Sequence, residues 1–155
     1  MPADQQQLVE RIAEVAGDRG LKIAAAESLT CGRVLSALGA GPNASSWLAG
    51  GVVAYDEEVK FGLLGVTRGP VITALCAREL ATGVAKVLDA DVAIGITGCG
   101  GPDPEEGQPP GTVYIAVAAD GEVHESHRRV DTDEPDAILD EVTTAALRLL
   151  ADTIA

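Results

Sequence analysis

Apolar residues recur along the chain with two kinds of spacing, and each kind predicts a different secondary structure. Apolar positions three or four residues apart are typical of amphipathic helices, whereas short continuous apolar runs are typical of buried strands. Helical spacing occurs over about 5–18, 33–38 and 71–88, and again from Ile138 to Leu150. The predicted strands cover 22–26, 51–55, 91–97, 112–119 and 122–130. Asp120-Gly121 separates the last two strands and is typical of a β-hairpin turn.

The order of the predicted elements favours an α/β protein. Strands and helices alternate through the first two thirds of the chain, and a hairpin and a helix close it. This order predicts a three-layer α/β/α sandwich with a mixed, mostly parallel sheet. No repeat, low-complexity tract or linker interrupts residues 1–155, so we expect a single domain. Aromatic residues make up only 3% of the chain, so the core has to be built from aliphatic side chains.

The net charge of the chain restricts the classes of partner that it can bind. A net charge of −13 repels a phosphate backbone, and no basic stripe or aromatic platform offsets it, so we expect no direct nucleic-acid contact. No apolar stretch is long enough to span a bilayer, and the first residues lack signal-peptide character. We therefore expect a cytoplasmic protein without a membrane partner, whose ligand is a small molecule.

The cysteines do not indicate a disulfide framework or a zinc site. Cys31, Cys76 and Cys99 are odd in number and lack CxxC spacing. Cys76 falls within a helical pattern, which favours a small core residue. The chain has no HExxH motif and no Asp/His cluster, so the sequence implies neither a metal nor another cofactor.

Three polar clusters follow predicted strands and carry the candidate chemistry. They are Glu27-Ser28-Leu29-Thr30, the segment from Tyr55 to Lys60, and Thr97-Gly98-Cys99-Gly100-Gly101-Pro102. In open α/β sheets, ligands bind beyond the carboxyl ends of the strands. Convergence of three clusters on one edge of the sheet predicts a functional site there.

Ser28 has two interpretations. Ser28 or Thr30 is a suitable helix N-cap, a role common for an isolated serine or threonine at this position. Alternatively, Ser28 is a nucleophile or a phosphate-binding hydroxyl. A serine nucleophile needs a base within reach, and Lys60 would supply one in a dry environment, although a lysine in a surface turn is usually solvated. Tyr55 would then orient the lysine or relay a proton, unless it only packs at the strand end.

The glycine-rich run TGCGGP is suited to holding an anion. Glycines allow successive backbone N–H groups to turn toward a phosphate or an oxyanion. A mobile surface loop is the alternative. The run matches neither GxxxxGK[ST] nor GxGxxG before a helix, so we do not expect a nucleoside triphosphatase or a Rossmann dehydrogenase.

Four motifs in this order resemble those of the CinA C-terminal domain family. They are AESLTCG, PNASSWLAGGVVAYDEEVKFGLLGV, GITGCGGP and PPGTVYIAVA, and the resemblance extends over about 5–153. It implies an α/β domain that hydrolyses the carboxamide of nicotinamide mononucleotide to a carboxylate and ammonia, without a metal, as a homodimer or larger homo-oligomer. Many full-length relatives carry an additional N-terminal domain, and we expect this chain to be the standalone form.

The resemblance also assigns roles to residues. It implies Ser28 as the nucleophile, with Ser45 as the second choice, Lys60 as the general base and Tyr55 as its assistant. The residues that it implies for substrate binding are Thr30, Ser45, Thr97, Gly98, Gly100 and Gly101.

The chain departs from the family pattern where a phosphate would be recognised. Pro135 and Leu139 stand where the family carries arginines, Glu57 replaces an asparagine and Cys31 replaces a glycine. Charge-assisted contacts to a phosphate are among the stronger hydrogen bonds in proteins, so the loss of two arginines matters. Two alternatives to a nicotinamide mononucleotide deamidase stay open: an inactive ligand-binding or partner module, and an amidase for a non-phosphorylated amide.

Overall fold

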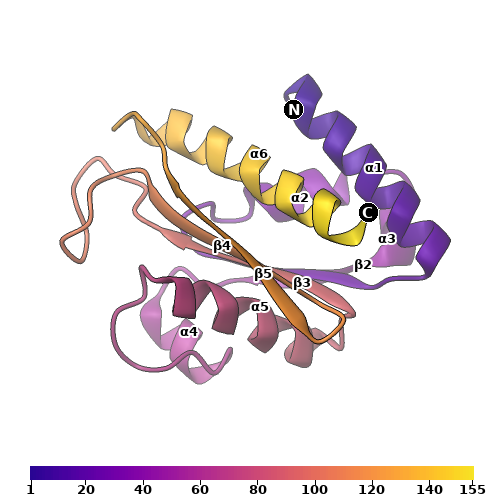
Figure 1. Ribbon diagram of the computed structural model, residues 1–155, viewed down its shortest axis with the longest axis horizontal. Helices are drawn as coiled ribbons and strands as arrows, with labels where there is room; N and C mark the ends of the chain where they lie inside the picture. The colour runs from indigo at the N-terminus through magenta and orange to yellow at the C-terminus, as the bar shows by residue number, and fades with distance from the viewer.

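The computed structural model describes residues 1–155, which form six helices and five strands (Figure 1). The helices are α1 (Ala3–Arg19), α2 (Arg33–Gly39), α3 (Ala44–Trp47), α4 (Glu57–Gly62), α5 (Ala74–Leu88) and α6 (Pro135–Ile154). The strands are β1 (Ile23–Glu27), β2 (Leu48–Val53), β3 (Val92–Gly98), β4 (Thr112–Ala119) and β5 (Glu122–Arg129). No helix combines the length and the apolar composition that crossing a bilayer requires.

The strands form one mixed sheet in the order β2-β1-β3-β4-β5. β1 pairs in parallel with both β2 and β3, whereas β3 with β4 and β4 with β5 are antiparallel pairs. Four of the five strands therefore run in the same direction, and only β4 opposes them. The prediction of an α/β sandwich with a mixed, mostly parallel sheet is confirmed.

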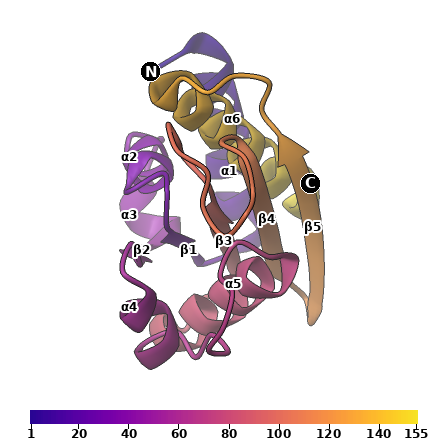
Figure 2. The ribbon, with the colours of Figure 1, turned by 90° about the vertical axis from the view of Figure 1, so that its left-hand side faces the viewer.

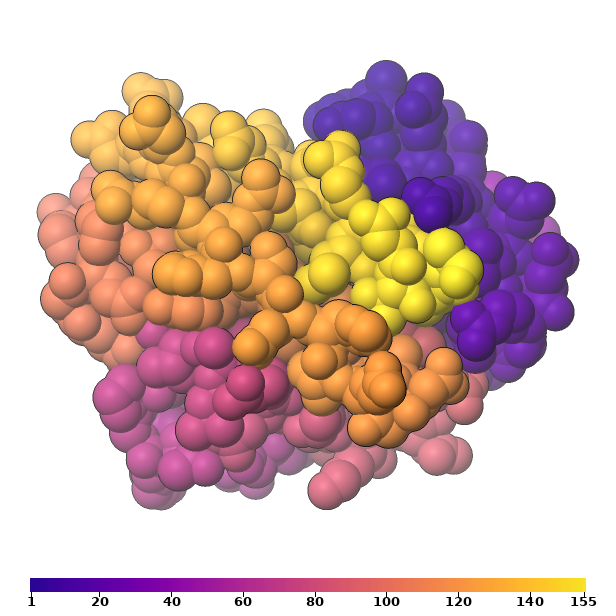
Figure 3. All heavy atoms as spheres, viewed as in Figure 1, coloured from indigo at the N-terminus to yellow at the C-terminus, as the bar shows by residue number.

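Helices cover both faces of the sheet (Figures 1 and 2). α1, α2, α3 and α6 lie on one face and share the larger apolar cluster, which contains Ile12, Ile94 and Leu147. α4 and α5 lie on the other face, where Leu80 and Val84 belong to a smaller cluster. β5 and α6 supply much of the molecular surface seen in Figure 3. The core is aliphatic, as the composition predicts, with Trp47 as its one large aromatic side chain.

Close packing of α5 on the sheet depends on a glycine in β3. A Cβ atom at Gly95 would lie 2.3 Å from the carbonyl oxygen of Ala77 and 2.6 Å from the amide nitrogen of Ala81. The helix backbone therefore rests almost directly on the strand. The contact holds this part of α5 against the position of β3 that pairs with Ala26 of β1.

The structure corrects several predicted boundaries. β2 covers Leu48–Val53 rather than 51–55, because its pairing with β1 begins at Leu48. α5 begins at Ala74 rather than at 71, since Thr73 is extended and its side chain accepts a hydrogen bond from the amide of Cys76. The short helices α3 and α4 were not predicted. α4 is capped by Asp56, whose carboxylate accepts from the amide of Glu58.

Candidate active site

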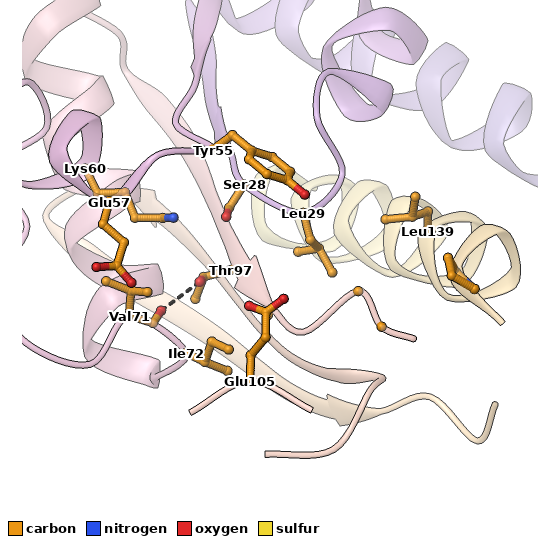
Figure 4. A pocket seen from close by; sticks show the side chains of 14 residues that line it. Ser28, Leu29, Tyr55, Glu57, Lys60, Val71, Ile72, Thr97, Glu105 and Leu139 are labelled. Carbon is orange, nitrogen blue, oxygen red and sulfur yellow. Dashed lines mark hydrogen bonds between the residues drawn. The ribbon is translucent and has the colours of Figure 1, made fainter. Parts of the chain in front are cut away.

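The three polar clusters meet at one cavity beyond the carboxyl ends of β1, β2 and β3 (Figure 4). Its volume is about 260 Å³. Ser28 comes directly after β1, Tyr55 follows β2, and Thr97 and Gly98 end β3. α4 supplies Lys60 from the side. The structure therefore brings members of all three clusters together in one cavity.

Ser28 lies at the end of β1 with its hydroxyl free. The residue is only 8% exposed, lines the cavity, and its side chain forms no hydrogen bond with the protein. It does not cap α2, which begins at Arg33 after a left-handed Gly32 with no side-chain cap. Of the two interpretations of this serine, the capping role is therefore wrong.

The turn after Ser28 is held by the buried carboxylate of Glu27. One oxygen accepts from the hydroxyl of Thr30 at 2.5 Å and from the amides of Gly32 and Val34 at 3.2 and 3.1 Å. The other oxygen accepts from the amide of Leu35 at 2.8 Å. Glu27 thus performs the capping that the sequence suggested for Ser28 or Thr30.

Lys60 is the single cationic residue in the cavity wall. It is only 3% exposed, yet its ammonium group forms no hydrogen bond or ion pair with the protein. In Figure 4 its Nζ atom and the hydroxyl of Ser28 point toward one another, although no hydrogen bond joins them. No buried side-chain nitrogen or oxygen atom lacks a hydrogen-bond partner, so the Nζ atom opens onto the cavity, where a ligand or a reaction can use it. The alternative of a solvated surface lysine is wrong.

Tyr55 stands at the rim of the cavity. It is 69% exposed, and its hydroxyl hydrogen-bonds to no protein group. Figure 4 shows its ring extending over Ser28 and Leu29, away from Lys60. The structure therefore does not bring the Tyr55 hydroxyl to Lys60, as the resemblance implied, and instead presents an aromatic face at the mouth of the cavity.

The loop after β3 is fixed rather than free. Glu106 accepts from the amides of Val71 and Ile72 at 2.9 and 2.8 Å, and Gln108 donates to the carbonyl oxygen of Ile72 at 2.6 Å. The Thr97 hydroxyl donates to the carbonyl oxygen of Val71 at 2.7 Å. Three polar side chains thus hold two backbone residues of the opposite wall. The alternative of a mobile surface loop is not what the structure shows.

Backbone groups beside Ser28 are available to an anion. Gly98, Gly100 and Gly101 line the cavity, and the amides of Gly100, Gly101 and Leu29 have no acceptor within the protein. Gly98 has to be a glycine, because a Cβ atom there would lie 2.5 Å from the carbonyl oxygen of Thr112. The arrangement provides N–H donors on the same wall as a free hydroxyl.

Two of the residues implied for substrate binding lie outside the cavity. Thr30 is buried, and its hydroxyl is committed to Glu27. Ser45 belongs to α3, which precedes β2. It therefore lies at the amino ends of the parallel strands, whereas Ser28 lies at their carboxyl ends. Ser45 is exposed there and does not contact the cavity. The structure therefore does not place Thr30 or Ser45 beside Ser28 and Lys60, as the resemblance implied.

The cavity wall also contains two carboxylates, and two uncharged residues stand where the family pattern has arginines. Glu57 and Glu105 line the cavity, and neither side chain has a hydrogen-bond or ion-pair partner. Pro135 and Leu139 line it from the first turns of α6. Sequence reasoning identified Glu57 but missed Glu105, since it lies within a loop whose path depends on contacts with residues more than 30 positions away.

The thiol of Cys76 lies under this site. Burial raises its pKa to about 11, and the nearby charge of Lys60 and hydroxyl of Thr97 lower it by less. Between pH 9, the ordinary pKa of a thiol, and pH 11, the unfolded chain releases this proton while the folded chain retains it.

We expect the free energy of unfolding to fall as the pH rises from 9 to 11, by on the order of 2 kcal/mol from Cys76. Urea unfolding at both pH values would measure it.

The matched comparison for this prediction is Cys76→Ala. Between pH 9 and 11, the free energy of unfolding of this variant should fall by about 2 kcal/mol less than that of the wild type. Equal slopes in the two proteins would contradict the assignment, because lysines and tyrosines that titrate in this range are common to both.

Comparison with known proteins gives a consistent result. A family model described as the CinA C-terminal domain matches residues 5–154. A protein of Geobacillus kaustophilus is 47% identical over 127 residues, which cover 78% of this chain and 30% of that protein. One of Bacillus subtilis is 40% identical over 131 residues, covering 80% and 32%. The names of both describe them as competence-damage inducible, and this chain spans about a third of their length.

Solved structures share the whole fold. A CinA superfamily protein of Klebsiella pneumoniae has a TM-score of 0.91 at 28% identity, covering 97% of each chain. The competence/damage inducible protein CihA of Agrobacterium tumefaciens has a TM-score of 0.93 at 27% identity, covering 98% of this chain and 96% of its own. The motifs, the fold and the family match together place this chain in the family of the CinA C-terminal domain.

Proposed function

We propose that the chain is an amidohydrolase in which Ser28 attacks a carboxamide and Lys60 is the general base. The observation that carries the proposal is the pair of unpartnered polar groups in one cavity, both on side chains more than nine-tenths buried. The family resemblance implies nicotinamide mononucleotide as substrate, with nicotinate mononucleotide and ammonia as products.

In the first half-reaction, Lys60, whose ammonium group has first lost a proton to solvent, takes the hydroxyl proton of Ser28, and Oγ bonds to the carboxamide carbon. The carbonyl oxygen becomes an oxyanion, for which the free amides of Leu29 and Gly100 are candidate donors. The C–N bond then breaks, and the Lys60 ammonium returns the proton to the departing nitrogen, which leaves as ammonia.

In the second half-reaction, water replaces the amine. Lys60 takes a proton from the water as its oxygen bonds to the acyl carbon. The bond to Ser28 Oγ breaks and Lys60 protonates the serine. The carboxylic acid then releases its proton to solvent and leaves as a carboxylate. Since Lys60 supplies the base in both halves, the scheme needs no further catalytic group.

Ammonia release from nicotinamide mononucleotide and from nicotinamide, measured with purified protein, tests this proposal. We expect Ser28→Ala to lower kcat by about a thousandfold, because the Thr97 hydroxyl is bonded to Val71 and the Tyr55 hydroxyl extends away from Lys60. Ser36→Ala, on the exposed face of α2, is the matched control and should keep full activity. Ser45→Ala should also keep it, and loss of activity there would instead support the second nucleophile.

A ligand-binding module without catalysis is the second candidate. The observation that favours it is the combination of Glu57, Pro135 and Leu139 in the cavity wall, where the family pattern carries other residues. A folded wild type that binds these amides but releases no ammonia would support this candidate against the amidohydrolase.

A further inference from the structure

The charges in the cavity wall oppose a phosphate. Glu57 and Glu105 are unpaired carboxylates, and Lys60 is the only cation facing them. In Figure 4 the carboxylate of Glu105 extends toward the middle of the cavity. A phosphate monoester carries about −1.5 to −2 charges at neutral pH, so the wall offers it net repulsion.

The start of α6 offers a phosphate little compensation. Pro135, at the first position of the helix, has no backbone N–H to donate, and Leu139 one turn later is apolar. The first turn also carries Asp136. Arg33 is held away by this residue and Asp140, which it contacts at 3.2 and 3.0 Å.

The same features suit a cation. The exposed carboxylates of the cavity wall attract positive charge, and the exposed ring of Tyr55 presents a π face at the mouth. A cation over an aromatic face gains roughly 0.5–1 kcal/mol at exposed sites, which adds to the attraction of the carboxylates. At the bottom of the cavity, the buried Ser28 and Lys60 remain free for an uncharged carboxamide.

We propose that this site selects carboxamides on a positively charged ring without a phosphate, such as N-substituted nicotinamide cations. The inference rests on the amidohydrolase proposed above and names its substrate class. Recognition divides between two levels of the cavity: the carboxamide reaches Ser28 and Lys60, while the cationic ring lies between Tyr55 and the carboxylates of Glu57 and Glu105.

The test compares three amides that differ in charge. Nicotinamide riboside is a cation, nicotinamide mononucleotide adds a phosphate to it, and nicotinamide is neutral. We expect the riboside to have the highest kcat/KM, on the order of tenfold above the mononucleotide. A higher kcat/KM for the mononucleotide would overturn the inference while leaving the amidohydrolase intact.

Calorimetric binding of the same compounds separates the two proposals. If no amide releases ammonia, the amidohydrolase fails, and the binding order still tests the charge selection. Tighter binding of the riboside than of the mononucleotide would support it, whereas equal or reversed binding would overturn it.

Substitutions test which residues cause the preference for the riboside over the mononucleotide. The double variant Glu57→Gln/Glu105→Gln should lower the ratio of riboside to mononucleotide kcat/KM several-fold, and Leu139→Arg should lower it by favouring the phosphate. Glu14→Gln, on the exposed face of α1, is the control for removing a carboxylate and should keep the wild-type ratio. A wild-type ratio in the double variant, with its thermal unfolding unchanged, would refute the roles of the carboxylates.

Discussion

Replacing Lys60 with methionine is expected to lower kcat for amide hydrolysis by about a thousandfold, because the variant has no base for Ser28. The free energy of unfolding should stay equal to that of the wild type or rise. Methionine fills the space of the lysine stem, and the lost ammonium leaves no protein partner unpaired. Ammonia release and urea unfolding, measured on the same preparation, would check both parts.

Lys86→Met is the matched control, since Lys86 is exposed at the end of α5 and its side chain forms no hydrogen bond or ion pair. It should leave kcat unchanged. Retained turnover in Lys60→Met would remove Lys60 from the mechanism. A large loss of stability in that variant would instead show that the ammonium has a structural partner in solution.

The second large effect is expected at Glu27. Substitution by leucine would leave the hydroxyl of Thr30 and the amides of Gly32, Val34 and Leu35 without their acceptor. Each buried donor left unpaired costs about 1–3 kcal/mol, so we expect the free energy of unfolding to fall by about 4 kcal/mol or more. Urea unfolding measures this change.

Glu27→Gln should cost less, about 2 kcal/mol, because its carbonyl oxygen can keep the contacts of one carboxylate oxygen while its NH₂ group opposes the amide of Leu35. Glu14→Gln is the control and should fall within about 0.5 kcal/mol of the wild type. Equal stability of Glu27→Leu and the wild type would mean that water replaces the carboxylate in the turn.

The sequence predicts the larger elements and misses those that depend on local detail. Long periodic segments such as α1, α5 and α6 were predicted because a packed helix repeats its apolar face over several turns. α3 and α4, of four and six residues, are too short to show a period. The predicted helix began at 71 because Ile72 continues the apolar spacing of α5, but one apolar residue in register does not distinguish helix from extended backbone.

The site was predictable where strand direction decides it. Ser28, Tyr55 and Thr97 follow or end parallel strands, so one edge of the sheet collects them. The roles of Glu106 and Gln108 were missed. Their partners Val71 and Ile72 lie about 35 residues away, and no local sequence pattern predicts such contacts. The motif resemblance implied a site role for Ser45, but Ser45 precedes β2 instead of following it and does not line the cavity.

α6 separates two tasks along one helix. Its first turns present Pro135 and Leu139 to the cavity, whereas Ile138, Val142 and Leu147 are buried in the core. Pro135 is therefore distinct from the residues that hold the helix on the sheet, whereas Leu139 both lines the cavity and packs against the core. Under the proposed function, a substitution at Pro135 would change the charge of the cavity without replacing a buried residue of α6, while Ser28 and Lys60 stay in place.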